Sequence, residues 1–199
     1  MEQRRFNPIM IFHFVLMVLV LVSSLYSAVK VLGYIHSNPE AFSNGGMFAT
    51  LFYGIYKIMT AIAICSGIIY LWNRYGKKAA MYYKAFLFLL VIASLFSVFD
   101  LVGIAYAAIS RPAIISLVVH IIKIAALLVL VFKKDLGKRR AWIVFCIVLA
   151  MDIIIGCIST GPELRPFRII GLLSRLAMDG TIGLALRGKY LDKASRGTV

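Results

Sequence analysis

Acidic residues are scarce in this chain. Only 8 of its 199 residues are Asp or Glu, against 22 Lys or Arg, and charged residues of both signs make up 15% of the sequence. Soluble domains usually carry about 25% charged residues. A chain this short can bury only a limited share of its surface, so a soluble fold has no interior for the 62% of residues that are hydrophobic. Lipid is therefore the predicted environment.

Cysteine and catalytic motifs are scarce as well. The three cysteines, Cys65, Cys146 and Cys157, lie inside apolar runs and form neither a CxxC pair nor a metal-ligand spacing, so we expect them to be buried small hydrophobes. The sequence contains no HExxH, GxSxG or Walker loop. Its histidines do not share a membrane depth, as two haem ligands would. No cofactor, metal site or catalytic residue is predicted, and an enzyme is the less favoured class.

Proline is absent from the interior of six long hydrophobic runs. At 1.5 Å per residue, about 20 helical residues cross the hydrocarbon core of a bilayer. The qualifying segments are approximately 9–35, 48–72, 81–109, 112–132, 141–159 and 167–187, and all five prolines fall at their edges. The first run is longer than the apolar part of a secretory signal, so we expect it to be retained as a span. The sequence predicts an all-α, polytopic membrane bundle of six helices in three hairpins, with residues 1–199 forming a single domain.

The basic residues are unevenly distributed between the loops. With the N-terminus inside, fifteen of them fall on the cytoplasmic side and four on or near the other. The positive-inside rule then predicts a multi-pass protein of a plasma or inner membrane with both termini in the cytoplasm. The net charge of +14 is explained by this topology, so nucleic acid is not an expected partner, whereas the lipid bilayer is.

The sixth run is the least apolar. Polar and glycine residues recur along it at helical spacing, namely Arg168, Gly171, Arg175, Asp179, Gly183 and Arg187. Such a stripe also occurs in an amphipathic helix that lies in the membrane interface. That arrangement would leave the basic C-terminal tail outside, against the charge bias, so a span is the preferred interpretation.

The second and third hairpins resemble an internal repeat. Asp100 and Lys123 are 23 residues apart, as are Asp152 and Arg175, and each hairpin turns at an Arg-Pro pair. Both pairs place an acid on the descending helix and a base on the returning one. We expect each pair to face one another at a similar depth within its own hairpin.

Seven ionisable residues are predicted to lie inside the membrane. They are Lys57, Asp100, His120, Lys123, Asp152, Arg175 and Asp179. A charged side chain at the bilayer centre costs about 2.5–3.5 kcal/mol even on a lenient scale, so these residues should pair in the bundle interior. Nearby hydroxyls, at Thr60, Ser94 and Ser97, are expected to bond their own helix backbone. Tyr53 and Tyr56, which flank Lys57, suit either a cation–π cage or a plain core, and the plain core is the preferred interpretation.

Two functions compete for this charged interior. The first is transport: a channel, carrier or solute-binding subunit whose pathway for a small solute or ion is lined by these residues. The alternative is a non-catalytic accessory or assembly subunit of a larger membrane complex, in which the charges dock helices, including those of other subunits. A third reading, an enzyme acting on lipid with external arginines holding a phosphate, lacks a nucleophile. Six spans in about 200 residues resembles the solute-binding membrane subunits of vitamin importers in architecture alone.

Overall fold

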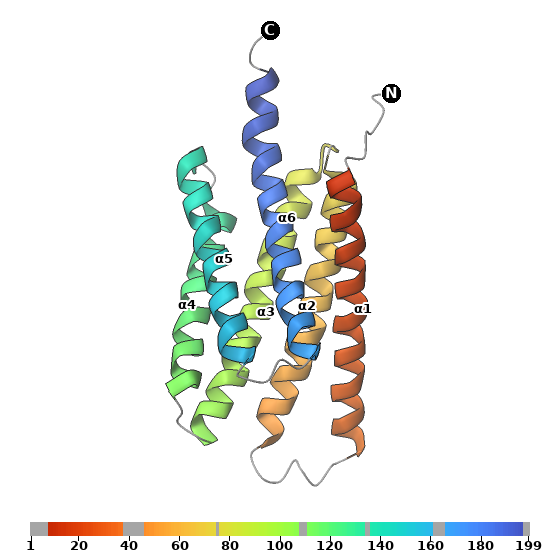
Figure 1. The fold of residues 1–199 in the computed structure, drawn as a ribbon, viewed down its shortest axis with the longest axis vertical. Coiled ribbons are helices and arrows are strands. Elements are labelled where there is room, and N and C mark those ends of the chain that lie inside the picture. Colours follow the sequence, from red (N-terminus) through yellow and green to blue (C-terminus); the bar gives the residue numbers. More distant parts are fainter. Residues whose placement is uncertain are drawn as a thin grey trace.

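The computed structural model describes residues 8–37, 46–74, 76–107, 111–133, 136–160 and 166–196. This part of the chain contains six α-helices and no strand, which confirms the all-α prediction (Figure 1). The helices are α1 (Pro8–Ser37), α2 (Gly46–Asn73), α3 (Ala79–Ala107), α4 (Arg111–Phe132), α5 (Lys138–Thr160) and α6 (Pro166–Arg196). Their bounds agree with the predicted segments to within a few residues, except that α6 continues past residue 187 to Arg196.

Prolines mark the start of three helices. Pro8 and Pro166 are the first residues of α1 and α6, and Pro112 is the second residue of α4. The first turn of a helix has no intrahelical partner for its N–H groups, so a residue without an N–H costs nothing there. This is why the proline positions predicted these helix starts.

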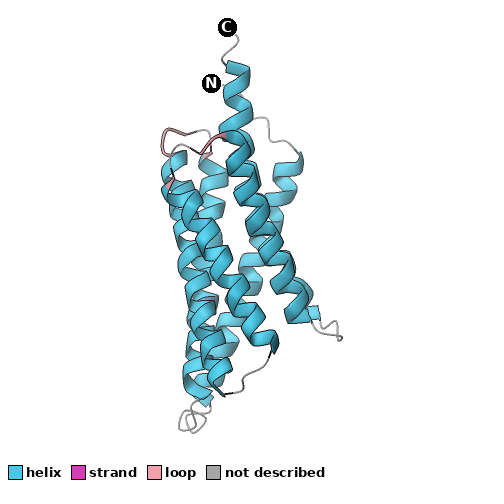
Figure 2. Cartoon of the chain, turned by 90° about the vertical axis from the view of Figure 1, so that its left-hand side faces the viewer, coloured by secondary structure: helices cyan, strands magenta, loops and turns pink. Residues whose placement is uncertain are grey.

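The helices form a closed ring. Successive helices run antiparallel, and the start of α1 and the end of α6 lie at the same end of the bundle (Figures 1 and 2). Each helix packs against its neighbours in the chain, with the most extensive contact between α2 and α3, and α6 returns to pack against α1. The ring leaves an interior onto which side chains from all the helices can be directed.

Five of the six helices are long and apolar enough to cross a membrane. The qualifying stretches are Pro8–Ser37, Leu51–Asn73, Ala79–Phe99, Arg111–Phe132 and Lys138–Ile158. The sixth helix, α6, is not among them, although it runs parallel to the other helices in Figure 1 and buries Ala177, Ile182 and Leu186 in the bundle. Packing of this kind suits a span better than a helix lying across the bundle; that α6 crosses the membrane stays a prediction.

The outward faces of the helices are apolar, as lipid contact requires. Phe12, Leu19 and Val29 on α1 are each more than 60% exposed, whereas Met17 on the same helix is fully buried. All three cysteines are also exposed on these outer faces, so the prediction that they are buried was wrong. The error has a physical cause: a helix in lipid is apolar all round, so its sequence does not show which face meets protein.

Glycine allows three helices to approach closely at one point of the ring. A Cβ atom at Gly67 on α2 would lie 2.9 Å from Met17 Cε on α1 and 3.0 Å from Phe86 Cε2 on α3. Both of these side chains are completely buried. Close packing of small residues of this kind drives helix association in membranes, where lipid removes most of the hydrophobic driving force.

The substitution Gly67→Leu should therefore destabilise the bundle. Overpacking in a well-packed core costs about 1–3 kcal/mol, and here buried side chains of two other helices, Met17 and Phe86, would both have to shift. The matched control is Gly33→Leu on α1, where an added Cβ meets nothing within 4 Å. Unfolding in detergent, followed by circular dichroism, should show a lower midpoint for Gly67→Leu alone. Equal midpoints for the two variants would contradict the close approach.

Candidate functional site

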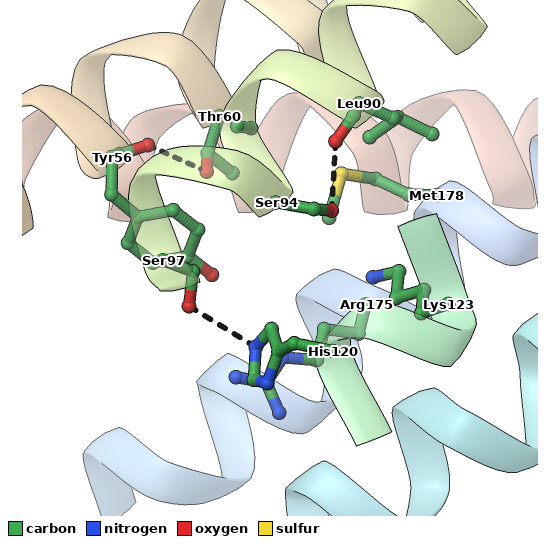
Figure 3. Close-up of a pocket in the computed structure, with 10 residues that line it drawn as sticks. Tyr56, Thr60, Leu90, Ser94, Ser97, His120, Lys123, Arg175 and Met178 are labelled. Atoms are coloured by element: carbon green, nitrogen blue, oxygen red, sulfur yellow. Dashed lines mark hydrogen bonds between the residues drawn. The ribbon is translucent and has the colours of Figure 1, made fainter. Parts of the chain in front are cut away.

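A small polar cavity lies near the middle of the helix ring. Its volume is about 20 Å³, and it is lined by side chains of α2, α3, α4 and α6 (Figure 3). The lining comprises Tyr56, Thr60, Leu90, Ala93, Ser94, Ser97, His120, Lys123, Arg175 and Met178. A space of this size holds about one water molecule. The cavity is thus a small, partly open chamber in the bundle, lined by both polar and apolar side chains.

A hydrogen bond between α3 and α4 forms one wall of the chamber. Ser97 Oγ lies 3.1 Å from Nε2 of His120, and Nδ1 of the same ring lies 2.8 Å from the carbonyl oxygen of Ser116. A carbonyl only accepts, so Nδ1 carries the proton in this contact. In the neutral ring, Nε2 then accepts the Ser97 hydroxyl proton. Contrary to prediction, Ser97 bonds another helix and not its own backbone.

Two further hydroxyls behave as the sequence predicted. Thr60 Oγ1 donates to the carbonyl of Tyr56 at 2.8 Å, and Ser94 Oγ donates to the carbonyl of Leu90 at 2.8 Å. These bonds, visible in Figure 3, occupy the hydroxyl protons. The oxygen lone pairs remain available to a donor in the chamber.

An ion-pair cluster adjoins the chamber. Lys123 Nζ on α4 donates to Asp152 Oδ1 on α5 at 2.6 Å, and Arg175 Nε on α6 lies 4.0 Å from the same oxygen. The Lys123 and Asp152 side chains are only 10% and 2% exposed. One carboxylate therefore connects three successive helices in the bundle interior. The predicted pairing of Asp152 with Arg175 is present at this longer distance.

The predicted pairing of Lys123 with Asp100, in its own hairpin, falls outside the described residues, because the side chain of Asp100 is not among them. The carboxylate that the structure brings to Lys123 is Asp152, from the next hairpin. The Ser97–His120 contact joins α3 to α4 beside this pair.

Asp179 is the second acid of this cluster. It is 2% exposed, and its Oδ2 has no hydrogen-bond partner among the described residues. It lies close enough to Asp152, Lys123 and Arg175 to interact with their charges. The cluster therefore places two acids and two bases at one point of the interior.

Lys57 is satisfied by aromatic rings. Its Nζ lies 5.1 Å from the centre of the Tyr53 ring and 5.5 Å from that of Tyr56, within the range of a cation–π interaction. Of the two arrangements that the sequence allowed for these tyrosines, the structure has the cation–π one and not the preferred plain core. Tyr56 also contributes to the chamber wall, beside Arg175. Lys57 is therefore linked to the chamber through one intervening ring.

A second polar contact closes the ring between α1 and α6. His13 Nε2 lies 2.9 Å from Thr181 Oγ1, and both side chains are buried. A Cβ atom at Gly180 would lie 2.7 Å from His13 Cε1, so the glycine permits the approach. The sequence alone predicted no such role for His13. The available signal was a single polar residue in the first half of a long apolar helix.

The predicted site residues are thus brought together in part. His120, Lys123 and Arg175 line the chamber, Asp152 and Asp179 adjoin it, and Lys57 contacts it through a ring. Missing from the prediction were the uncharged polar members, Tyr56, Thr60, Ser94 and Ser97, because each alone resembles an ordinary residue that bonds its own helix.

Comparison with known proteins does not identify a family for this chain. No family model matches the chain, and no curated protein or solved structure matches it either. Its function is therefore inferred from its own sequence and geometry.

The two contacts of Asp152 should differ in energy. Removing one partner of a buried ion pair costs about 3–5 kcal/mol, because the other charge remains buried and uncompensated. A double-mutant cycle with Lys123→Met and Asp152→Asn should give a coupling energy of about 2 kcal/mol. The matched cycle with Arg175→Met and Asp152→Asn should give less, because the atoms are 4.0 Å apart. Unfolding free energies in detergent measure both couplings, and similar values would contradict the observed geometry.

Proposed function

We propose that this chain is a transport-related membrane protein whose charged interior binds a small ion or polar solute. The observation that carries the proposal is the small chamber at mid-bundle, which Lys123 and Arg175 line together with hydroxyls from two other helices. Ionisable residues inside a membrane are costly, and they most often mark a solute or ion pathway. Sites in transporters also lie near the bilayer midplane, where helices from different parts of the chain meet.

The charged side chains of the chamber favour an anion. The two that belong to its described lining, Lys123 and Arg175, are both basic and lie beside the neutral ring of His120, whereas Asp152 and Asp179 are not part of the lining. The Arg175 guanidinium carries five N–H donors, more than its contact with Asp152 requires. A volume of about 20 Å³ admits a single small group, so larger solutes would need the helices to separate. Chloride is the first ion to test.

The charge pairing also weighs against the accessory-subunit alternative. Charges kept for docking a partner chain would lie unpaired on an outer face of the isolated protein. Here Lys123 and Asp152 pair with each other, and both are buried within this chain. The interior therefore satisfies its main charges without another subunit.

Exposed basic side chains support the proposed orientation. At the end of the bundle where α1 begins, the described exposed ones are Lys77, Lys78, Lys84, Lys133, Lys138, Arg139, Arg140 and Arg187. At the opposite end Arg111 is exposed, and Lys30 lies in the adjoining half of α1. Such a difference orients membrane proteins with the basic end in the cytoplasm. We therefore place both termini there, in a plasma or inner membrane.

Chloride release from proteoliposomes tests the transport proposal. Vesicles containing the protein should release chloride faster than empty vesicles, as measured with a chloride electrode. Arg175→Gln should slow the release by about tenfold, equivalent to about 1.4 kcal/mol of lost interaction. The control is Arg187→Gln, which removes an exposed charge of the same helix and should have no effect. Folded protein that releases no chloride, or release unaffected by Arg175→Gln, would exclude this site as a chloride pathway.

Cysteine labelling tests the orientation. In a background without the three native cysteines, Lys138→Cys and Arg111→Cys place thiols at opposite ends of the bundle. A membrane-impermeant maleimide should label Arg111→Cys in intact cells and Lys138→Cys only in inverted vesicles. The reverse pattern would place both termini outside.

A further inference from the structure

A hollow on the outer face of α5 is unrelated to the interior chamber. The residues that line it lie between Arg139 and Met151 on α5, and its volume is about 470 Å³. Cys146 and Ala150, two small residues one turn apart, form its centre, with the larger Ile143 and Ile147 beside them. Small side chains between bulky ones leave a shallow, open groove along the helix.

The groove is charged at one end and apolar along its length. Arg139 lies at the start of α5, between the exposed Lys138 and Arg140, and the remaining lining residues are apolar. Trp142 follows one turn later, as aromatic residues do at the level of lipid head groups. An anionic head group on an apolar tail has the complementary distribution of charge.

The length of the groove indicates whether its occupant is a lipid or a transmembrane helix. Arg139 and Met151 are twelve residues apart, which spans about 18 Å of helix. One leaflet of the hydrocarbon core is about 15 Å thick, half of the 30 Å that a partner helix would cover. The groove therefore matches one acyl chain that descends from a head group held at Arg139.

We propose that this groove is a binding site for an anionic phospholipid, with the phosphate at Arg139 and one acyl chain over Cys146 and Ala150. The inference does not depend on the transport proposal. A basic residue beside an anionic lipid contributes an attraction that corresponds to about a fivefold preference. Ordinary lipid contact on the other apolar faces would show no comparable selectivity between head groups.

Tryptophan fluorescence can measure this selectivity, because the chain has only two tryptophans. The full chain carrying Trp72→Phe leaves Trp142 as the single reporter. It is reconstituted in phosphatidylcholine vesicles containing either brominated phosphatidylglycerol or brominated phosphatidylcholine at equal mole fraction. Brominated phosphatidylglycerol should quench Trp142 more strongly than brominated phosphatidylcholine, and Arg139→Gln should reduce this preference about fivefold.

Two further variants separate a built site from general surface charge. Lys84→Gln removes another exposed basic residue at the same end of the bundle and should leave the preference unchanged. Ala150→Phe fills the hollow without changing charge and should weaken the preference. Equal quenching by the two lipids, or equal losses in Arg139→Gln and Lys84→Gln, would overturn the proposal. The proposal would also be overturned if the protein were dimeric and neither lipid quenched Trp142. A second copy of the chain would then cover this face of α5.

Discussion

The cost of placing charge inside a bilayer governs this structure. A helix in lipid gains little from hydrophobic association, whereas an unpaired intramembrane charge is expensive, so polar contacts decide which helices meet. The pair between Lys123 and Asp152 joins α4 to α5, and Arg175 extends the same cluster to α6. The bond between His13 and Thr181 joins α6 to α1. Several helix contacts of the closed ring are thus stabilised by polar groups that could find no hydrogen-bond or charge partner in lipid.

The same constraint creates the chamber. Helices that meet through polar side chains pack less closely than helices that meet through glycine, as α1, α2 and α3 do at Gly67. Where Arg175, Lys123 and His120 converge, a polar space of about 20 Å³ remains between four helices. Its small volume fits a binding point for a single small group better than an open pore. In the proposed transport function, the ion pairs that stabilise the ring would also have to rearrange when a solute enters.

The outer surface of the ring has the apolar composition that contact with lipid requires. Its exposed surface consists largely of aliphatic and aromatic side chains, and even its cysteines face outward. Against this uniform background, the groove below Arg139 on α5 differs because it combines basic charge with two small residues. The same constraint therefore acts on both proposed sites. A charge next to the hydrocarbon core needs a partner, which is protein in the interior and would be a lipid head group at the outer face.

The sequence by itself determined the helices. Long apolar runs bounded by proline fixed their number and approximate ends, because hydrogen bonds within each helix are the only way for a lone segment to satisfy its backbone in lipid. It also predicted which ionisable residues lie within the helices. The partner of Lys123 was decided only by tertiary structure: its ion pair with Asp152 joins α4 to α5, a packing result that the 23-residue spacing did not encode. The uncharged polar lining, Tyr56, Thr60 and Ser94, was equally invisible, because helices that are apolar all round do not show in sequence which face turns inward.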